Sequence, residues 1–85
     1  MYHVYVLKSK KDHSLYVGYT SNIERRFEEH NRGLVTYTRN RFPWELVYYE
    51  TFISIEDARR REKNLKYFGR AFGQLKGRIK NSLNT

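Results

Sequence analysis

Two short β-like segments and the helix that follows them constrain the fold more than any other feature. Residues 2–8 are rich in β-branched and aromatic side chains on both alternating faces, which is typical of a strand covered on two sides. Residues 15–19 have the same character, and the short polar segment between them favours an antiparallel hairpin. Gly18 lies inside the second segment, where a glycine weakens a strand unless another backbone or a ligand approaches closely. The sequence therefore predicts a hairpin with a point of close approach at Gly18.

Capping patterns mark where the first two helices begin. Ser21 and Glu24 form a Ser-x-x-Glu pattern directly after the hairpin, and Gly33 is a natural C-terminal stop for the helix between them. Ser54 and Asp57 form a similar pattern before a second apolar stripe at helical spacing. The sequence therefore predicts one helix directly after the hairpin and another beginning near residue 55.

The remaining elements complete a small domain of mixed structure. Residues 45–52 predict a third strand, and residues 70–81 predict a third helix. The element order is then β-β-α-β-α-α, an α/β fold of the α+β type with a three-stranded, mainly antiparallel sheet flanked by about three helices. We expect one domain over residues 1–81 and a disordered tail over residues 82–85.

Composition narrows the choice of partner. Seventeen Lys and Arg against nine Asp and Glu give a net charge of +8 in 85 residues, which favours a polyanion such as nucleic acid, with solubility alone as the alternative. The absence of cysteine excludes disulfides and thiolate metal sites. No apolar run approaches the roughly 18 residues that span a bilayer, and the first residues do not form a signal peptide. We therefore expect a cytoplasmic protein that does not associate with membranes.

Glu62 interrupts the apolar stripe of the second helix. The stripe consists of Ile55, Ala58, Glu62 and Leu65. A carboxylate in such a stripe is costly unless it is paired or binds a metal ion. A structural ion pair with a nearby arginine and a helix rotated so that Glu62 reaches the rim both remain open. A single carboxylate with water and a substrate phosphate would suit magnesium.

Four residues on the first three elements are candidates for catalysis. Tyr5 and Tyr16 lie on adjacent predicted strands, and core packing is the alternative for both; a tyrosine acts as a general base only if its pKa is brought down from about 10. Arg26 borders the buried stripe of its helix and suits a phosphate, unless it is simply solvated. His30 lies one turn further on the same side, where a structural role is the alternative.

A basic and aromatic loop precedes the third strand. Arg39 and Arg41 stand among Tyr37, Phe42 and Trp44. This composition fits contacts to a phosphate backbone with base stacking, and the alternative is a loop whose aromatic side chains close the core.

Taken together, these residues resemble the GIY-YIG nuclease domain. The resemblance rests on Val4-Tyr5, Tyr16-Val17-Gly18, residues 22–27 with Arg26, then His30, and residues 61–66 with Glu62. It extends over nearly the whole chain and is greatest to small stand-alone members related to the N-terminal domain of the bacterial excision-repair nuclease. The first motif departs from the family where His3 replaces its glycine and Val4 its isoleucine.

The resemblance implies a metal-dependent endonuclease that cleaves phosphodiester bonds. Glu62 would hold one Mg²⁺ or Mn²⁺ ion, Arg26 would stabilise charge on the phosphate, Tyr16 or Tyr5 would activate or position water, and His30 would relay its proton. Residues expected to contact nucleic acid are Gly18, Arg25, Arg39, Arg41 and Lys63.

DNA is favoured over RNA as the substrate, in a repair or recombination reaction, with a protein partner as one source of specificity. The alternative function is a non-catalytic nucleic-acid-binding module that keeps the same fold.

Overall fold

The computed structural model describes all residues from 1 to 85 and is built on a three-stranded antiparallel sheet. The strands are β1 (Tyr2–Ser9), β2 (Leu15–Thr20) and β3 (Trp44–Phe52), and β1 lies in the centre between β2 and β3. The helices are α1 (Ile23–Asn31), α2 (Ile55–Tyr67), α3 (Gly69–Arg78) and the short α4 (Lys80–Leu83). The predicted sheet, its antiparallel pairing and the order of the elements are confirmed, with one short helix added at the end.

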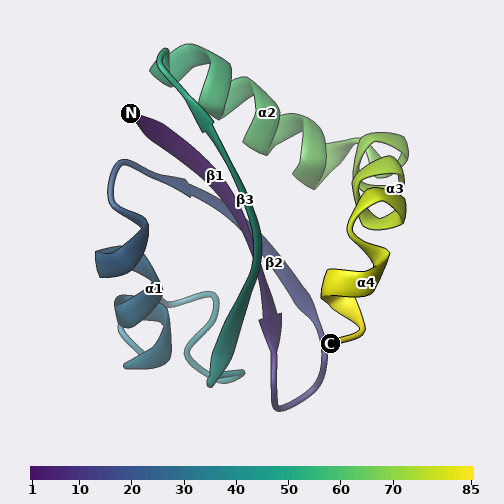
Figure 1. The fold of residues 1–85 in the computed structure, drawn as a ribbon. Coiled ribbons are helices and arrows are strands. Elements are labelled where there is room, and N and C mark those ends of the chain that lie inside the picture. The colour runs from purple at the N-terminus through teal and green to yellow at the C-terminus, as the bar shows by residue number, and fades with distance from the viewer.

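Helices cover both faces of the sheet (Figure 1). The α2, α3 and α4 helices lie on one side, where Val4 and Val6 of β1 pack with Ala58 and Leu65 of α2. On the other side lie α1 and the loop that follows it, over the alternate residues of β1 and over Trp44. The central strand is therefore buried on two sides, as its apolar residues at both alternating positions predict.

Local signals determine where the helices begin and end. Asn22 caps α1, since its side chain accepts a hydrogen bond from the backbone N–H of Arg25 at 3.0 Å. The predicted capping box beginning at Ser21 is therefore wrong by one residue, because β2 continues through Thr20 and the helix begins later. The stop at Gly33 is confirmed: this residue has φ +73°, a conformation that glycine adopts without strain. Ser54 caps α2 as expected.

The C-terminal segment differs most from the prediction. The helix expected over residues 70–81 ends at Arg78, and α4 follows after Ile79. Leu83 packs against the core on the α2 side, and its carbonyl oxygen accepts a hydrogen bond from Lys8 Nζ at 2.5 Å. The structure thus holds residues 80–83 against the sheet, where the sequence predicts a disordered tail from residue 82. No helix in the chain has the length and the apolar character that crossing a membrane requires.

Candidate active site

Tyr5 and Gly18 face each other across the hairpin, and the Tyr5 ring occupies the space that a side chain at position 18 would need. Tyr5 on β1 pairs with Gly18 on β2, and a Cβ atom added to Gly18 would lie 2.5 Å from Cζ of the Tyr5 ring, with the Tyr5 hydroxyl also in collision. The predicted close approach at Gly18 is therefore real, but a tyrosine ring and not a ligand fills the space. Gly18 is buried, so we assign it the placement of Tyr5 in place of the predicted contact with nucleic acid.

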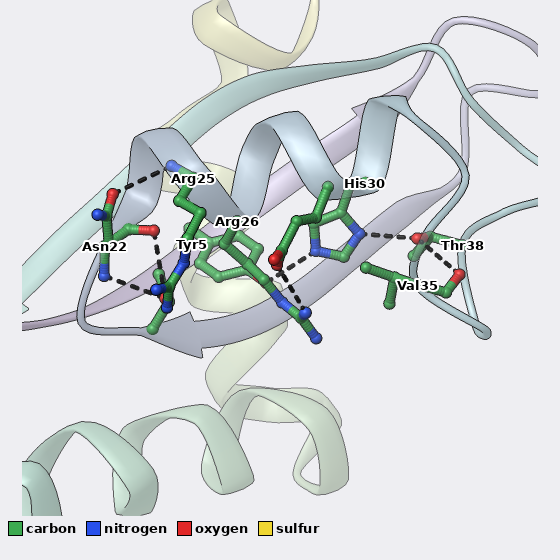
Figure 2. A network of polar contacts seen from close by, with 9 residues as sticks. Tyr5, Asn22, Arg25, Arg26, His30, Val35 and Thr38 are labelled. Carbon is green, nitrogen blue, oxygen red and sulfur yellow. Dashed lines mark hydrogen bonds and ion pairs between the residues drawn. The ribbon is translucent and has the colours of Figure 1, made fainter.

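A chain of hydrogen bonds fixes the Tyr5 hydroxyl (Figure 2). The hydroxyl lies 2.9 Å from Nε2 of His30 on α1, and Nδ1 of His30 lies 2.7 Å from Oγ1 of Thr38 in the following loop. Every polar atom is satisfied when Tyr5 donates to His30, His30 donates to Thr38, and Thr38 donates to the Val35 carbonyl at 3.5 Å. His30 and Thr38 are fully buried and Tyr5 nearly so. We call these three residues the Tyr5–His30–Thr38 network.

The network is uncharged at neutral pH. Burial, together with the neighbouring Arg26 guanidinium, lowers the pKa of His30 to about 4, against a smaller opposing effect of Glu29. Burial also raises the pKa of Tyr5 to about 12, reinforced by Tyr16 and Glu62 and opposed by Arg26. A general base needs a pKa near the working pH, so in the free protein Tyr5 does not meet the condition for activating water. His30 acts here as a hydrogen-bonding partner of Tyr5.

Tyr16 lies next to the network but faces a cleft. Its ring centre lies 5.1 Å from that of His30 and 6.5 Å from that of Tyr5. It is half-buried and lines a cleft of about 440 Å³, which we call the Tyr16 cleft; its other lining residues are Tyr37, Arg41, Lys66 and Tyr67. Of the two predicted tyrosines, Tyr16 is therefore the one that a substrate in this cleft can reach.

Arg26 stands at the edge of the network, with 38% of its side chain exposed (Figure 2). Its guanidinium forms an ion pair with Glu29 one turn along α1, with 3.0 Å between Nη1 and Oε1. It also lies close enough to the Tyr5 hydroxyl to lower the pKa of that group. Glu29 is a residue that the sequence analysis did not select, although an acid three positions after an arginine on a helix signals such a pair.

Glu62 reaches the same region from α2. Its carboxylate is about four-fifths buried, with 19% of the side chain exposed, and its Oε2 lies 3.2 Å from Nζ of Lys66. The same Nζ lies 5.1 Å from the centre of the Tyr16 ring, so a single ammonium group links Glu62 to Tyr16. The ion pair that the sequence left open therefore exists, but with a lysine and not with an arginine.

The residues around Glu62 suit one divalent cation bound together with a substrate. Glu62 lines a cleft of about 490 Å³, the Glu62 cleft, whose other lining residues are Tyr19, Arg59, Arg60, Lys63, Lys66 and Tyr67. No group of three or more His, Cys, Asp or Glu side chains is placed to enclose an ion. Magnesium keeps several waters and often takes only one or two carboxylates plus phosphate oxygens, so this donor set fits it.

The predicted nucleic-acid contacts separate into exposed and fixed side chains. Arg25, Arg39 and Lys63 are exposed, and Lys63 lines the Glu62 cleft. Arg41 donates hydrogen bonds to Ser14 Oγ and to the Tyr37 carbonyl, both at 2.9 Å, and lies over the Trp44 ring. The alternative interpretation of the basic and aromatic loop is that its aromatic side chains close the core. It is confirmed for Trp44, which is buried, but not for Tyr37 and Phe42, which are exposed.

The residues on which the resemblance rests come together in the structure. The ring centres of Tyr5 and Tyr16 lie 6.5 Å apart, and Arg26 lies beside the Tyr5 hydroxyl. Glu62 is linked to the Tyr16 ring through the Lys66 ammonium. The family model described as the GIY-YIG catalytic domain matches residues 1–76, and the chain belongs to this family. The family and the fold that the resemblance implies are thereby confirmed.

Relatives narrow the comparison further. The chain is 49% identical to the UPF0213 protein SH2523 of Staphylococcus haemolyticus, over 81% of this chain and 84% of that protein. It is 48% identical to the UPF0213 protein CPE1444 of Clostridium perfringens, over 78% of this chain and 71% of that protein. The solution NMR structure of the UPF0213 protein BH0048 from Bacillus halodurans superimposes with a TM-score of 0.59 and 36% identity, covering 100% of this chain and 95% of that one. The chain thus matches most of the length of each of these proteins.

Proposed function

We propose that the chain is a metal-dependent endonuclease that hydrolyses phosphodiester bonds, with DNA as its substrate in preference to RNA. The observation that carries the proposal is the convergence of residues far apart in sequence at the Tyr5 hydroxyl. Arg26 from α1 lies close enough to lower the pKa of this hydroxyl, and the ring centre of Tyr16 from β2 lies 6.5 Å from that of Tyr5. Glu62 from α2 is joined to the Tyr16 ring by the Lys66 ammonium, which lies 3.2 Å from the carboxylate and 5.1 Å from the ring centre. Perturbed groups gathered beside a cleft are typical of active sites.

Glu62 is the residue that would hold Mg²⁺ or Mn²⁺. When bound, such an ion supplies charge neutralisation at a phosphate oxygen. Lys66 pairs with Oε2 of the Glu62 carboxylate at 3.2 Å, so its ammonium would lie beside the same phosphate and could pair with it.

Arg26 and Tyr16 carry the parts of the reaction that belong to the chain itself. The Arg26 guanidinium provides a fixed planar donor for the charge that develops on the phosphate. Its ion pair with Glu29 holds it in place without burying it. Tyr16 faces the cleft, so its hydroxyl orients the attacking water. The hydrogen bonds of the Tyr5–His30–Thr38 network keep Tyr5 protonated and fix the position of its ring.

The experiment is cleavage of labelled single-stranded, duplex and branched DNA, and the corresponding RNA, with Mg²⁺, with Mn²⁺ and with chelator. We expect products only with a divalent cation. Glu62→Gln should abolish cleavage, whereas the matched change Glu56→Gln, at an exposed position of the same helix, should leave it intact. Equal cleavage by both variants, or cleavage in chelator, would contradict the proposal.

The second candidate, a non-catalytic nucleic-acid-binding module, has one observation in its favour. The Lys66 ion pair neutralises Glu62 in the free protein, and no other carboxylate stands ready to share a metal ion. This candidate predicts tight binding of nucleic acid with no products under any metal condition, so the same assay separates the two.

A further inference from the structure

The Tyr16 cleft has two exposed aromatic walls that the proposed chemistry does not use. Tyr37 from the loop and Tyr67 at the end of α2 both line it, and they are 80% and 73% exposed. Single exposed aromatic residues are common on protein surfaces, but these two line one cleft together with the candidate catalytic Tyr16. The volume, about 440 Å³, is in the range of sites for small organic groups.

The wall that carries Tyr37 is rigid. Its carbonyl accepts a hydrogen bond from the Arg41 guanidinium, which is itself held by Ser14 and by the Trp44 ring. The next residue, Thr38, is fully buried in the network with His30. The Tyr37 ring therefore projects into solvent from a fixed backbone, as a binding surface would, and not from a loose loop.

The side chains that line the Tyr16 cleft give it a positive charge. Its lining contains two cations, Arg41 and Lys66, and no carboxylate, whereas the adjacent Glu62 cleft contains the candidate metal ligand. Lys66 and Tyr67 line both clefts. Aromatic faces with cations beside them are the usual means of binding a nucleobase together with its phosphate.

We propose that Tyr37 and Tyr67 form a stacking subsite for one unpaired nucleobase next to the phosphate that is cleaved. This inference deepens the proposed function and rests on the nucleic-acid binding that it includes. The faces of a base inside a duplex are covered by its neighbours, so only a base that has left the stack can lie against these rings. The subsite therefore selects single-stranded or locally unpaired nucleic acid.

The test is equilibrium binding in chelator, measured by fluorescence anisotropy with three probes. The probes are a single-stranded oligothymidylate of about twelve nucleotides, an otherwise identical strand with abasic sites, and a duplex of the same length. We expect Tyr37→Ala and Tyr67→Ala each to weaken binding of the intact single strand about tenfold, the scale of one lost base–aromatic stack. Tyr37→Phe should keep the affinity. Tyr49→Ala is the matched control, because this tyrosine is 54% exposed on β3 and does not line the cleft.

The abasic strand decides whether the rings act on bases. It keeps the phosphates but removes the base that both rings contact, so wild type should bind it about a hundredfold more weakly than the intact strand, and Tyr37→Ala should cause no further loss. Equal losses on all three probes, or an equal loss in Tyr49→Ala, would overturn the subsite. Because no cleavage takes place in chelator, a protein without nuclease activity can still support this inference, and an active nuclease can still contradict it. The melting temperature of each variant establishes that it is folded.

Discussion

The two halves of the candidate active site are held in different ways. The Tyr5–His30–Thr38 network is buried and uncharged, and each of its polar atoms has a partner within the protein. The Glu62 half is charged and faces a cleft, and its partner Lys66 is a flexible side chain that is one-third exposed. Burial stabilises the neutral groups of the first half and fixes their geometry, whereas the second half depends on one ion pair at the wall of a cleft.

The uncharged state of the network should make stability depend on pH. His30 has a folded-state pKa of about 4 against an ordinary value of 6.5, so the unfolded chain binds more protons between these values. The stabilisation is complete above about pH 6.5 and is lost as the pH falls towards 4. It amounts to about 3 kcal/mol, since one pKa unit corresponds to about 1.4 kcal/mol. Urea unfolding of wild type and His30→Gln across this range should show the difference.

A histidine elsewhere provides the control for this pH dependence. His13 is exposed in the turn after β1 and has φ +65°, so His13→Asn keeps a residue that tolerates this conformation. This variant should lose stability with falling pH as wild type does. The imidazole resonances of His30 give a direct check by NMR, and a midpoint near 6.5 would show that the network is not held neutral.

Arg26 lies beside the Tyr5 hydroxyl and close to His30, so removing it should affect the titration of the network as well as catalysis. Arg26→Ala should lower turnover about 100-fold, the scale for losing one fixed charge stabiliser. The free energy of unfolding should change by only about 0.5 kcal/mol, because the side chain is half-exposed and Glu29 can be solvated. Loss of the guanidinium should also raise the pKa of His30, a readout independent of catalysis.

Arg32→Ala is the matched control for Arg26, since it removes an exposed arginine at the C-terminal cap of the same helix that is likewise paired with a glutamate, Glu28. It should leave both turnover and the His30 titration near their wild-type values. If the two alanine variants lost turnover equally, Arg26 would be one contributor to a basic surface and not a specific phosphate ligand.

Gly18→Ala tests how rigid the buried half is. The added Cβ collides with the Tyr5 ring, which cannot move without breaking its bond to His30, so we expect a cost of about 2 kcal/mol, within the usual range for overpacking. Gly73→Ala in α3 is the control: nothing lies near its Cβ position, so alanine should stabilise the helix by up to about 1 kcal/mol. Thermal unfolding measures both, and a neutral Gly18→Ala would show that the network is loosely packed.

The sequence predicted the fold well because the signals are local and repeated. Apolar residues at both alternating positions of β1 require cover on two faces, and the stripes of α2 and α3 supply it on one side. The predicted disordered tail differs from the structure because residues 80–83 are held by long-range contacts. Leu83 packs on the core and its carbonyl accepts a hydrogen bond from Lys8, and no local sequence pattern reveals either contact.

The residues of the candidate site differ in how far the sequence alone predicts their contacts. Glu29 and Lys66 lie three and four positions after residues already selected, so helical spacing alone would have found both as ion-pair partners. The sequence does not predict the role of Thr38, because its contact with His30 depends on the path of the loop. The pKa of Tyr5 likewise depends on burial and on three elements that meet only in the folded chain.

The ion pair between Glu62 and Lys66 should have a small effect on the affinity for a metal ion. If the Lys66 ammonium and a metal ion compete for the Glu62 carboxylate, Lys66→Met should bind Mn²⁺ about fivefold more tightly, because a partly exposed ion pair is worth up to about 1 kcal/mol. Lys63→Met is the matched control: it removes the same charge from the same cleft but breaks no ion pair with Glu62. Its effect should be smaller, since only screened, longer-range repulsion is relieved. Calorimetric titration of both variants and wild type measures the difference without nucleic acid. Equal gains in both would reduce Lys66 to one positive charge among many, and weaker binding in Lys66→Met would mean that it helps to hold the site open for the ion.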